Sequence, residues 1–355
     1  MKRNFLLAVH SFAGLFVGLF VLLMSLSGAA LVFHDELDSL QYPSIIQKEN
    51  APLLPVDSCY RSLQKHFPHA QVSNVNLAEN ISTPFVFVVY DSSFQDGKQS
   101  MQVFVHPQTA EVIFQRGGSK DIRHNFMSWL SAFHNSFHLK KKGEWLLGFF
   151  GIIFIVSLIT GIILYRRSVI DVILFRKRVL RSGNLHQLIG VYALLFNLMI
   201  GITGYWMQRY VFKKSFYATT QPYTPVIKPS PALFFNVDSA LQGVKKQYPA
   251  FTGHVIYFAP TMARKTAVYG SQSTNAFIHS KKFADVIFLD SAGNIAKTAF
   301  VNEIEPANRY DIVNSQIHFG KYGGWPVKIL YSLFGLSGGL LSITGFLLWL
   351  RKRRR

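Results

Sequence analysis

Residues 5–33 read FLLAVHSFAGLFVGLFVLLMSLSGAALVF, and residues 185–207 read LHQLIGVYALLFNLMIGITGYWM. Each stretch is longer than the about 20 apolar residues that a helix needs to cross a bilayer. Two further stretches of this kind lie at 145–165 and 326–350. The sequence therefore predicts an α-helical membrane protein with four transmembrane helices.

Positive charge gathers at one end of each apolar stretch. The 355 residues include 37 Lys and Arg against 18 Asp and Glu, a net charge of +19. The clusters are at Lys2 and Arg3, at 166–181 and at 351–355. Because cytoplasmic loops carry an excess of Lys and Arg, we expect both termini and the 167–183 loop to be cytoplasmic, in a bacterial inner membrane. No separate basic domain remains, which excludes nucleic acid as a partner and leaves membrane lipid as the surroundings.

The two halves of the chain repeat each other. His10 precedes Gly14 by 4 positions and Gly28 by 18, and His186 precedes Gly190 and Gly204 by the same spacings. In the same way, His134 and His318 each precede a Thr-Gly pair, with 27 positions to its glycine. A parallel repeat of this kind predicts two pseudo-symmetric halves related by an axis along the membrane normal.

The repeat predicts the domain organisation. Each half is expected to carry a small α+β domain on the periplasmic side, with one helix (57–68 or 238–249) before its strands (72–77, 85–90 and 100–105, or 254–258, 267–269 and 285–289). The predicted order is transmembrane helix 1 at 1–34, periplasmic domain 1 at 35–143 with a His-bearing segment at 125–139, helix 2 at 144–166, the basic loop at 167–183, helix 3 at 184–208, periplasmic domain 2 at 209–325, helix 4 at 326–350 and the basic tail at 351–355.

Equivalent residues of a repeat face each other across its axis. His10 is therefore expected opposite His186 near the cytoplasmic side, and His134 opposite His318 near the outer side. Eighteen residues are five helical turns, so Gly28 lies on the same face as His10, with Gly14 about 40° away. The pattern predicts two sites in which paired histidines ligate haem b and Gly14, Gly28, Gly190 and Gly204 leave room for the macrocycle. Two axial histidines leave iron no open position, which favours electron transfer, although a proton relay or a buried hydrogen bond would also account for an intramembrane histidine.

The outer ligand of the first half has an alternative. His138 follows His134 by four residues, the spacing of two metal ligands on one helix turn, but Tyr322 stands at the position that matches His138 in the second half. From His134 to Arg166 a continuous helix would measure about 48 Å, which exceeds the membrane core of about 30 Å. We therefore expect helix breaks at 140–143 and 322–326.

The chain resembles the PepSY-associated transmembrane-helix family of iron-regulated inner-membrane proteins, and ferric-siderophore reductases in particular. The resemblance rests on four segments: VHSFAGLFVGLF (9–20), SAFHNSFHL (131–139) with GEWLLGFFG (143–151), NLHQLIGVYAL (184–194), and IHFGKYGGWP (317–326) with SITGFLLWLRKR (342–353). It implies that both periplasmic domains are PepSY-like, and that haem passes electrons outward to reduce Fe(III) held by a siderophore. His10, His186, His134 and His318 are the implied ligands, and no further catalytic residue is predicted.

The electron donor is expected to be a separate reductase, a reduced flavin or a quinol, because the cytoplasmic loop is too short for a nucleotide domain. A non-enzymatic membrane regulator of a peptidase or an iron-uptake partner is the main alternative function. A permease is the third, and the absence of charged residues from the predicted midplane of the helices argues against it.

Overall fold

The computed structural model of the chain describes residues 3–47, 51–90, 100–174, 185–213, 235–259, 265–272, 278 and 282–354. It divides into two compact units. One comprises Met1–His34, Leu130–Thr220 and Asn314–Arg355, and the other Asp35–Trp129 and Gln221–Val313. We call them the helical unit and the sheet unit and describe each by itself. Much of the predicted basic loop at 167–183, and Arg355 of the basic tail, lie outside the described residues.

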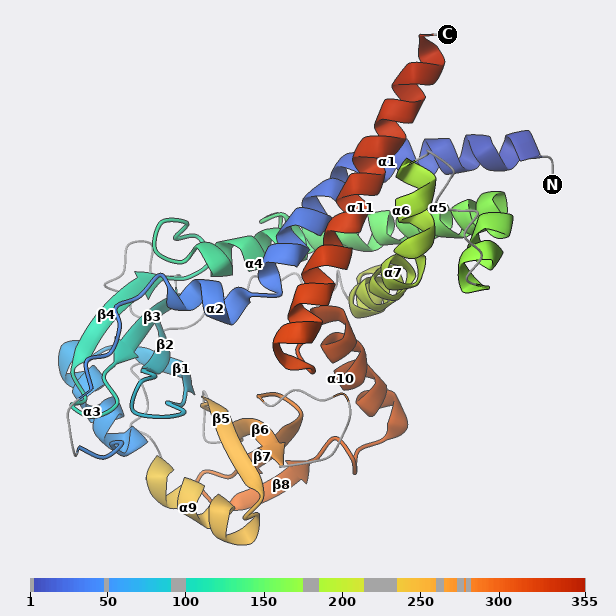
Figure 1. The fold of residues 1–355 in the computed structure, drawn as a ribbon. Helices are drawn as coiled ribbons and strands as arrows, with labels where there is room; N and C mark the ends of the chain where they lie inside the picture. Colours follow the sequence, from blue (N-terminus) through green and yellow to red (C-terminus); the bar gives the residue numbers. More distant parts are fainter. Residues whose placement is uncertain are drawn as a thin grey trace. The chain divides into compact units, whose positions relative to one another are not determined.

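Long apolar helices build the helical unit. α1 (Arg3–Leu31) packs along both α5 (Lys141–Ile173) and α11 (Gly324–Arg353), and Figure 1 shows α1 and α11 crossing. These three helices are long and apolar enough to cross a membrane. A fourth span is present if the bent pair α6 (Leu185–Tyr192) and α7 (Leu194–Gln208), which the 3-10 helix η2 (Arg209–Phe212) extends, counts as one. The chain is thus a multi-pass membrane protein.

The third predicted helix, 184–208, is not one straight rod. Its two parts meet at an angle of 64° next to Ala193. The buried Asn197 amide donates to the Ala193 carbonyl oxygen at 2.9 Å and to Ser337 Oγ of α11 at 2.8 Å. The Asn197 backbone N–H keeps its own bond to the same carbonyl oxygen at 2.9 Å, so the side chain adds a link to α11 and replaces no helical hydrogen bond. The sequence predicts one helix over 184–208, and the structure divides it in two at Ala193.

Both predicted helix breaks are present, but each lies a few residues before its predicted position at 140–143 or 322–326. α4 (Phe126–Ser136) ends five residues before α5 begins, and α10 (Pro306–Phe319) ends five residues before α11 begins. The first connection has positive φ at Phe137, His138 and Lys140, whereas the second has it at Gly320 and Gly324. His134 and His318 therefore lie on short helices of their own.

The sheet unit contains one antiparallel sheet of eight strands in the order β4-β3-β2-β1-β5-β6-β7-β8. The strands are β1 (Gln71–Asn76), β2 (Phe85–Tyr90), β3 (Ser100–Val105), β4 (Val112–Gly117), β5 (Phe251–Tyr257), β6 (Thr266–Gln272), β7 (Asp285–Leu289) and β8 (Ile295–Ala299). β4 and β8 were not predicted. The expectation of two separate α+β domains is corrected, because β1 pairs with β5 and joins both repeats in one sheet.

The junction of the two repeats is two-fold symmetric. Val75 pairs with Ile256, and the neighbouring pairs are Asn74 with Tyr257 and Asn76 with Val255. Since equivalent residues of the two repeats here differ by 181 positions, Val75 pairs with its own counterpart. The pseudo-two-fold axis of the sheet passes through this pair.

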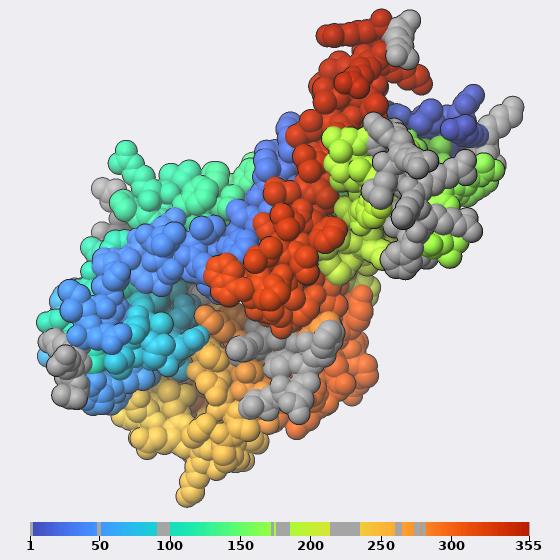
Figure 2. All heavy atoms as spheres, in the orientation of Figure 1, coloured from blue at the N-terminus to red at the C-terminus, as the bar shows by residue number. Residues whose placement is uncertain are grey.

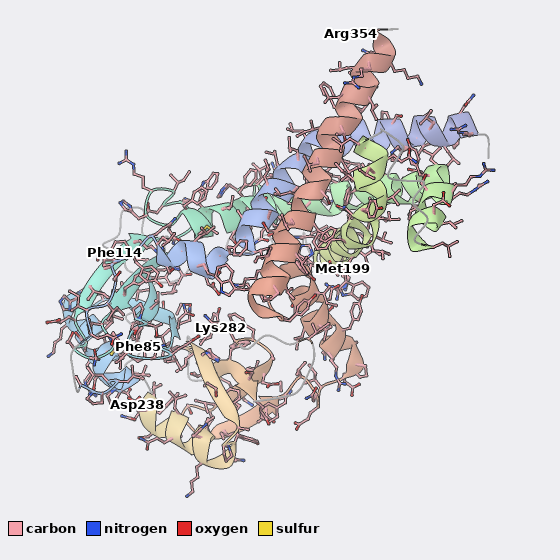
Figure 3. All side chains as sticks on the ribbon, in the orientation of Figure 1. Phe85, Phe114, Met199, Asp238, Lys282 and Arg354 are labelled. Carbon is pink, nitrogen blue, oxygen red and sulfur yellow. The ribbon has the colours of Figure 1, made fainter. Side chains whose placement is uncertain are left out.

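Two amphipathic helices, α3 (Val56–His66) and α9 (Val237–Gln247), provide side chains to the core of the sheet unit. Asp57 Oδ2 accepts from the Asp238 amide at 2.9 Å, and Asp238 Oδ2 accepts from the Asp57 amide at 2.8 Å. Figure 3 labels Asp238 at the start of α9. Each carboxylate thereby caps the first turn of the other helix, where free N–H groups need acceptors.

Candidate functional site

The first predicted histidine pair meets inside the helical unit. His10 of α1 and His186 of α6 have ring centres 6.3 Å apart. Both line a cavity of about 880 Å³, to which Gly14, Gly190 and Gly345 also contribute. This volume is within the range of about 300–1,000 Å³ that is typical of small-molecule and cofactor sites.

The separation of the two imidazoles is compatible with one metal ion between them. A bond of about 2.0 Å from metal to nitrogen, plus about 1.1 Å from that nitrogen to the ring centre, separates opposed ring centres by about 6.2 Å. Within the described residues, no three His, Cys, Asp or Glu side chains gather as a metal site. The pair therefore suits a metal that brings other ligands of its own, as haem iron does.

Each of the four predicted histidines is held through Nδ1 by a hydroxyl on a neighbouring helix. The hydroxyl belongs in every case to a Ser/Thr-Gly pair. The contacts are His10 with Thr160 Oγ1 at 3.2 Å, His134 with Ser27 Oγ at 2.8 Å, His186 with Thr344 Oγ1 at 2.9 Å, and His318 with Thr203 Oγ1 at 2.9 Å. Both members of each contact come from the same half of the chain.

The surroundings of these hydroxyls favour one tautomer of the imidazoles. Each hydroxyl lies 2.7–2.9 Å from the backbone carbonyl oxygen four residues earlier in its own helix, to which it donates. A hydroxyl has one hydrogen, so it then accepts from the imidazole, which assigns the proton to Nδ1. His10 Nδ1 also lies 3.0 Å from the Ser157 carbonyl oxygen, which can only accept. A proton on Nδ1 leaves the Nε2 lone pair for a metal, and such contacts are usual behind metal-bound histidines.

The glycine of each pair makes room for an imidazole. A Cβ on Gly28 would lie 3.2 Å from Cε1 of His134, and one on Gly204 would lie 3.0 Å from Cε1 of His318. Gly161 and Gly345 stand in the same relation to His10 and His186, at 3.2 and 3.3 Å.

The predicted glycines thus divide between the two histidine pairs. Gly14 and Gly190 line the cavity with His10 and His186. Gly28 and Gly204 instead contact the outer histidines, because 18 residues are about 27 Å of helix and reach the other end of the span.

The second histidine pair also lies within the helical unit. His134 lies against Gly28 of α1, and His318 lies against Gly204 of α7. His138 is placed differently. It follows the end of α4, has a left-handed backbone with φ of 58° and is exposed. It therefore does not share a helix turn with His134, as the four-residue spacing had suggested.

The chain matches a known family over most of its length. Residues 7–352 match the family described as PepSY-associated TM region. The chain belongs to this family. The match includes residues of both the helical unit and the sheet unit. No curated protein matches the chain in sequence.

The structure also reveals polar residues that sequence reasoning missed. Asn314 lies one helical turn before His318 and is 2% exposed, and its amide donates to the Thr203 carbonyl oxygen at 3.2 Å. Among the described residues, its Oδ1 has no hydrogen-bond partner. The residue matching Asn314 in the first half is Leu130, so the outer pair has a polar neighbour on one side of the axis. This departure from the repeat is the signal in the sequence that could have identified Asn314 as a candidate site residue.

Proposed function

We propose that this protein is a di-haem electron-transfer protein of the bacterial inner membrane. In this proposal His10 and His186 hold one haem b, and His134 and His318 hold the other. When bound, haem supplies a one-electron carrier without an open iron position. The observation that carries the proposal is the fourfold contact of an imidazole Nδ1 with a Ser/Thr-Gly pair, which presents each Nε2 as a ligand.

The roles of the chain's own residues follow from these contacts. The hydroxyls hold the imidazoles in one tautomer and one orientation, so that each is ready to bind a metal without reorganisation. Apolar side chains such as Val17, Val21 and Phe154 line the interior of the cavity and give a ligand there apolar surroundings. Side chains held rigidly in this way suit electron transfer, which is fastest when little around the carrier has to move.

We further propose that the acceptor is a ferric siderophore, whose iron is reduced from Fe(III) to Fe(II) on the periplasmic side, and that the enzyme is thus a ferric-siderophore reductase. The family resemblance supports this substrate class. The electrons are proposed to come from a separate reductase, a reduced flavin or a quinol. Both termini are proposed to be cytoplasmic, because the basic clusters of the sequence lie at that end of the helices.

The test is the haem content of the purified full-length chain. We expect a b-type reduced-minus-oxidised spectrum and about two haems per chain by pyridine haemochrome. Alanine at any one of His10, His186, His134 or His318 is expected to remove about one haem. His138→Ala is the matched control and should keep both.

Reduction of a ferric siderophore by the dithionite-reduced protein then tests the acceptor. A chain that binds no haem when haem supply is adequate would overturn the proposal. The alternative function, a non-enzymatic membrane regulator anchored by the helical unit, would then be the better interpretation. Haem binding without siderophore reduction would overturn only the proposed substrate.

A further inference from the structure

The cavity between His10 and His186 is different at its two ends. Leu15, Val17 and Val21 line it on α1 in the interior of the helical unit. At the other end it is lined by Asn4 of α1 and by Lys352 and Arg353 of α11. No acidic side chain is among the described residues that line it. The lining is thus mostly apolar in the interior, where Ser157 and the two histidines are polar members, and cationic at the end formed by Lys352 and Arg353, which we call the mouth.

The cations at the mouth lie on the same side of α11 as the histidine contact. Lys352 follows Gly345 by seven residues, which is about two turns and about 10 Å along the helix, so both point to nearly the same side. Trp349 lies between them and also lines the cavity, and the Arg353 guanidinium stacks over its ring at 4.4 Å from the ring centre. This cation–π contact keeps Arg353 on the cavity side of the helix.

The other two arginines of this helix end face elsewhere. Arg351 and Arg354 follow Gly345 by six and nine residues, which turns them by about 120° and 180° from it. Neither lines the cavity. Figure 2 shows the last turns of α11, in red, extending beyond the neighbouring helices, and Figure 3 labels Arg354 there.

We propose that Lys352 and Arg353 bind the carboxylates of the ligand that lies between His10 and His186. The inference rests on the proposed function, in which that ligand is haem b and the carboxylates are its two propionates. An amphiphilic plate with an anionic edge matches a cavity that is apolar inside and has two cations at its mouth. The arrangement also assigns the orientation of the ligand, with its carboxylate edge toward the basic end of α1 and α11.

The experiment compares haem with its dimethyl ester, in which both carboxylates are neutral. The full-length protein is loaded with either form, and its release to excess apomyoglobin is followed. Haem is released from two sites in separate phases. Lys352 and Arg353 do not contact the His134–His318 site, so release from that site is an internal reference for folding. The variant is Lys352→Gln with Arg353→Gln, and the control is Arg351→Gln with Arg354→Gln, which removes the same charge from the other faces of the same turns.

Two charge-assisted contacts at a partly exposed mouth are each worth a few-fold in affinity, so one phase of haem release should become about tenfold faster in the variant. The control should release haem like the unmodified protein, and the ester should leave the variant and the unmodified protein at equal rates. Equal acceleration of haem and ester, or no acceleration of haem, would overturn the inference while the two-haem proposal stands. A chain that holds no haem would overturn the proposed function itself.

Discussion

The hydroxyl of Ser27 should matter more for haem binding than the hydroxyl of Thr160. Ser27 Oγ lies 2.8 Å from His134 Nδ1 and, among the described residues, is the hydrogen-bond partner that the structure shows for that atom. Ser27→Ala removes this contact, and loss of such a contact behind a metal-bound histidine costs about 10- to 100-fold in affinity. His10 keeps the Ser157 carbonyl oxygen at 3.0 Å when Thr160 becomes Val. The loss in that variant should stay below about 1 kcal/mol, or about fivefold.

Haem release to apomyoglobin measures both variants, because each is expected to change a different phase. Ser27→Ala should accelerate release from the His134–His318 site, and Thr160→Val should change release from the His10–His186 site only slightly. The midpoint potential of the affected haem gives a second readout, since loss of the Nδ1 contact makes the ligand less basic. Equal effects of the two substitutions, or unchanged release from Ser27→Ala, would refute the assignment of Nδ1 as the donor to these hydroxyls.

Two further predictions concern packing and pH. Gly204→Ala places a Cβ 3.0 Å from Cε1 of His318, so it should destabilise the protein by about 1–3 kcal/mol and lower the haem content. The control is Gly18→Ala, whose new Cβ has no atom within 4 Å, and which should be neutral or slightly stabilising. Similar thermal unfolding of the two variants would contradict the packing argument. Burial raises the pKa of the Asp238 carboxyl, and this effect together with the nearby Asp57 carboxylate outweighs the lowering by the backbone N–H groups of Asp57 and Val56. The folded chain therefore binds the Asp238 carboxyl proton more tightly than the unfolded chain does. Its contribution to the free energy of unfolding is fully present below about pH 4 and is lost as pH rises through the pKa of the folded state. Unfolding of the sheet unit measured across this range should show the loss, and Asp238→Asn should reduce it; an unchanged slope in that variant would assign the pH dependence to other groups.

The sequence predicts the membrane spans and the pairing of histidines better than it predicts the hydrogen bonds that hold the histidines. Apolar length identifies α1, α5 and α11, and the repeat predicts that His10 meets His186, at 6.3 Å in the structure. The hydrogen bonds to the Ser/Thr-Gly pairs could not be predicted, because small residues in membrane helices also serve ordinary close packing. Only the distance of Gly28 from His10 along α1 indicates that the two belong to different sites.

Pairings between distant segments were the other limit. Alternating residues predict a strand such as β1, but they do not say which strand lies beside it. The joining of β1 to β5 in one sheet was missed for this reason. The bend beside Ala193 was missed because the length of an apolar stretch identifies a span but does not show where the helix bends.

The hydroxyl contacts of the histidines connect residues of one half, whereas the histidine pairs connect the two halves. A single half could therefore orient its own imidazoles, and two identical halves related by a two-fold axis would already form both pairs, one sheet and the mutual helix caps. This is the arrangement of a C2 homodimer, the commonest symmetry among oligomers. Gene duplication and fusion of such an ancestor would free the two copies to diverge. Asn197 and Asn314, which stand opposite Val21 and Leu130 in the first half, are polar substitutions that a homodimer could introduce only in both copies at once.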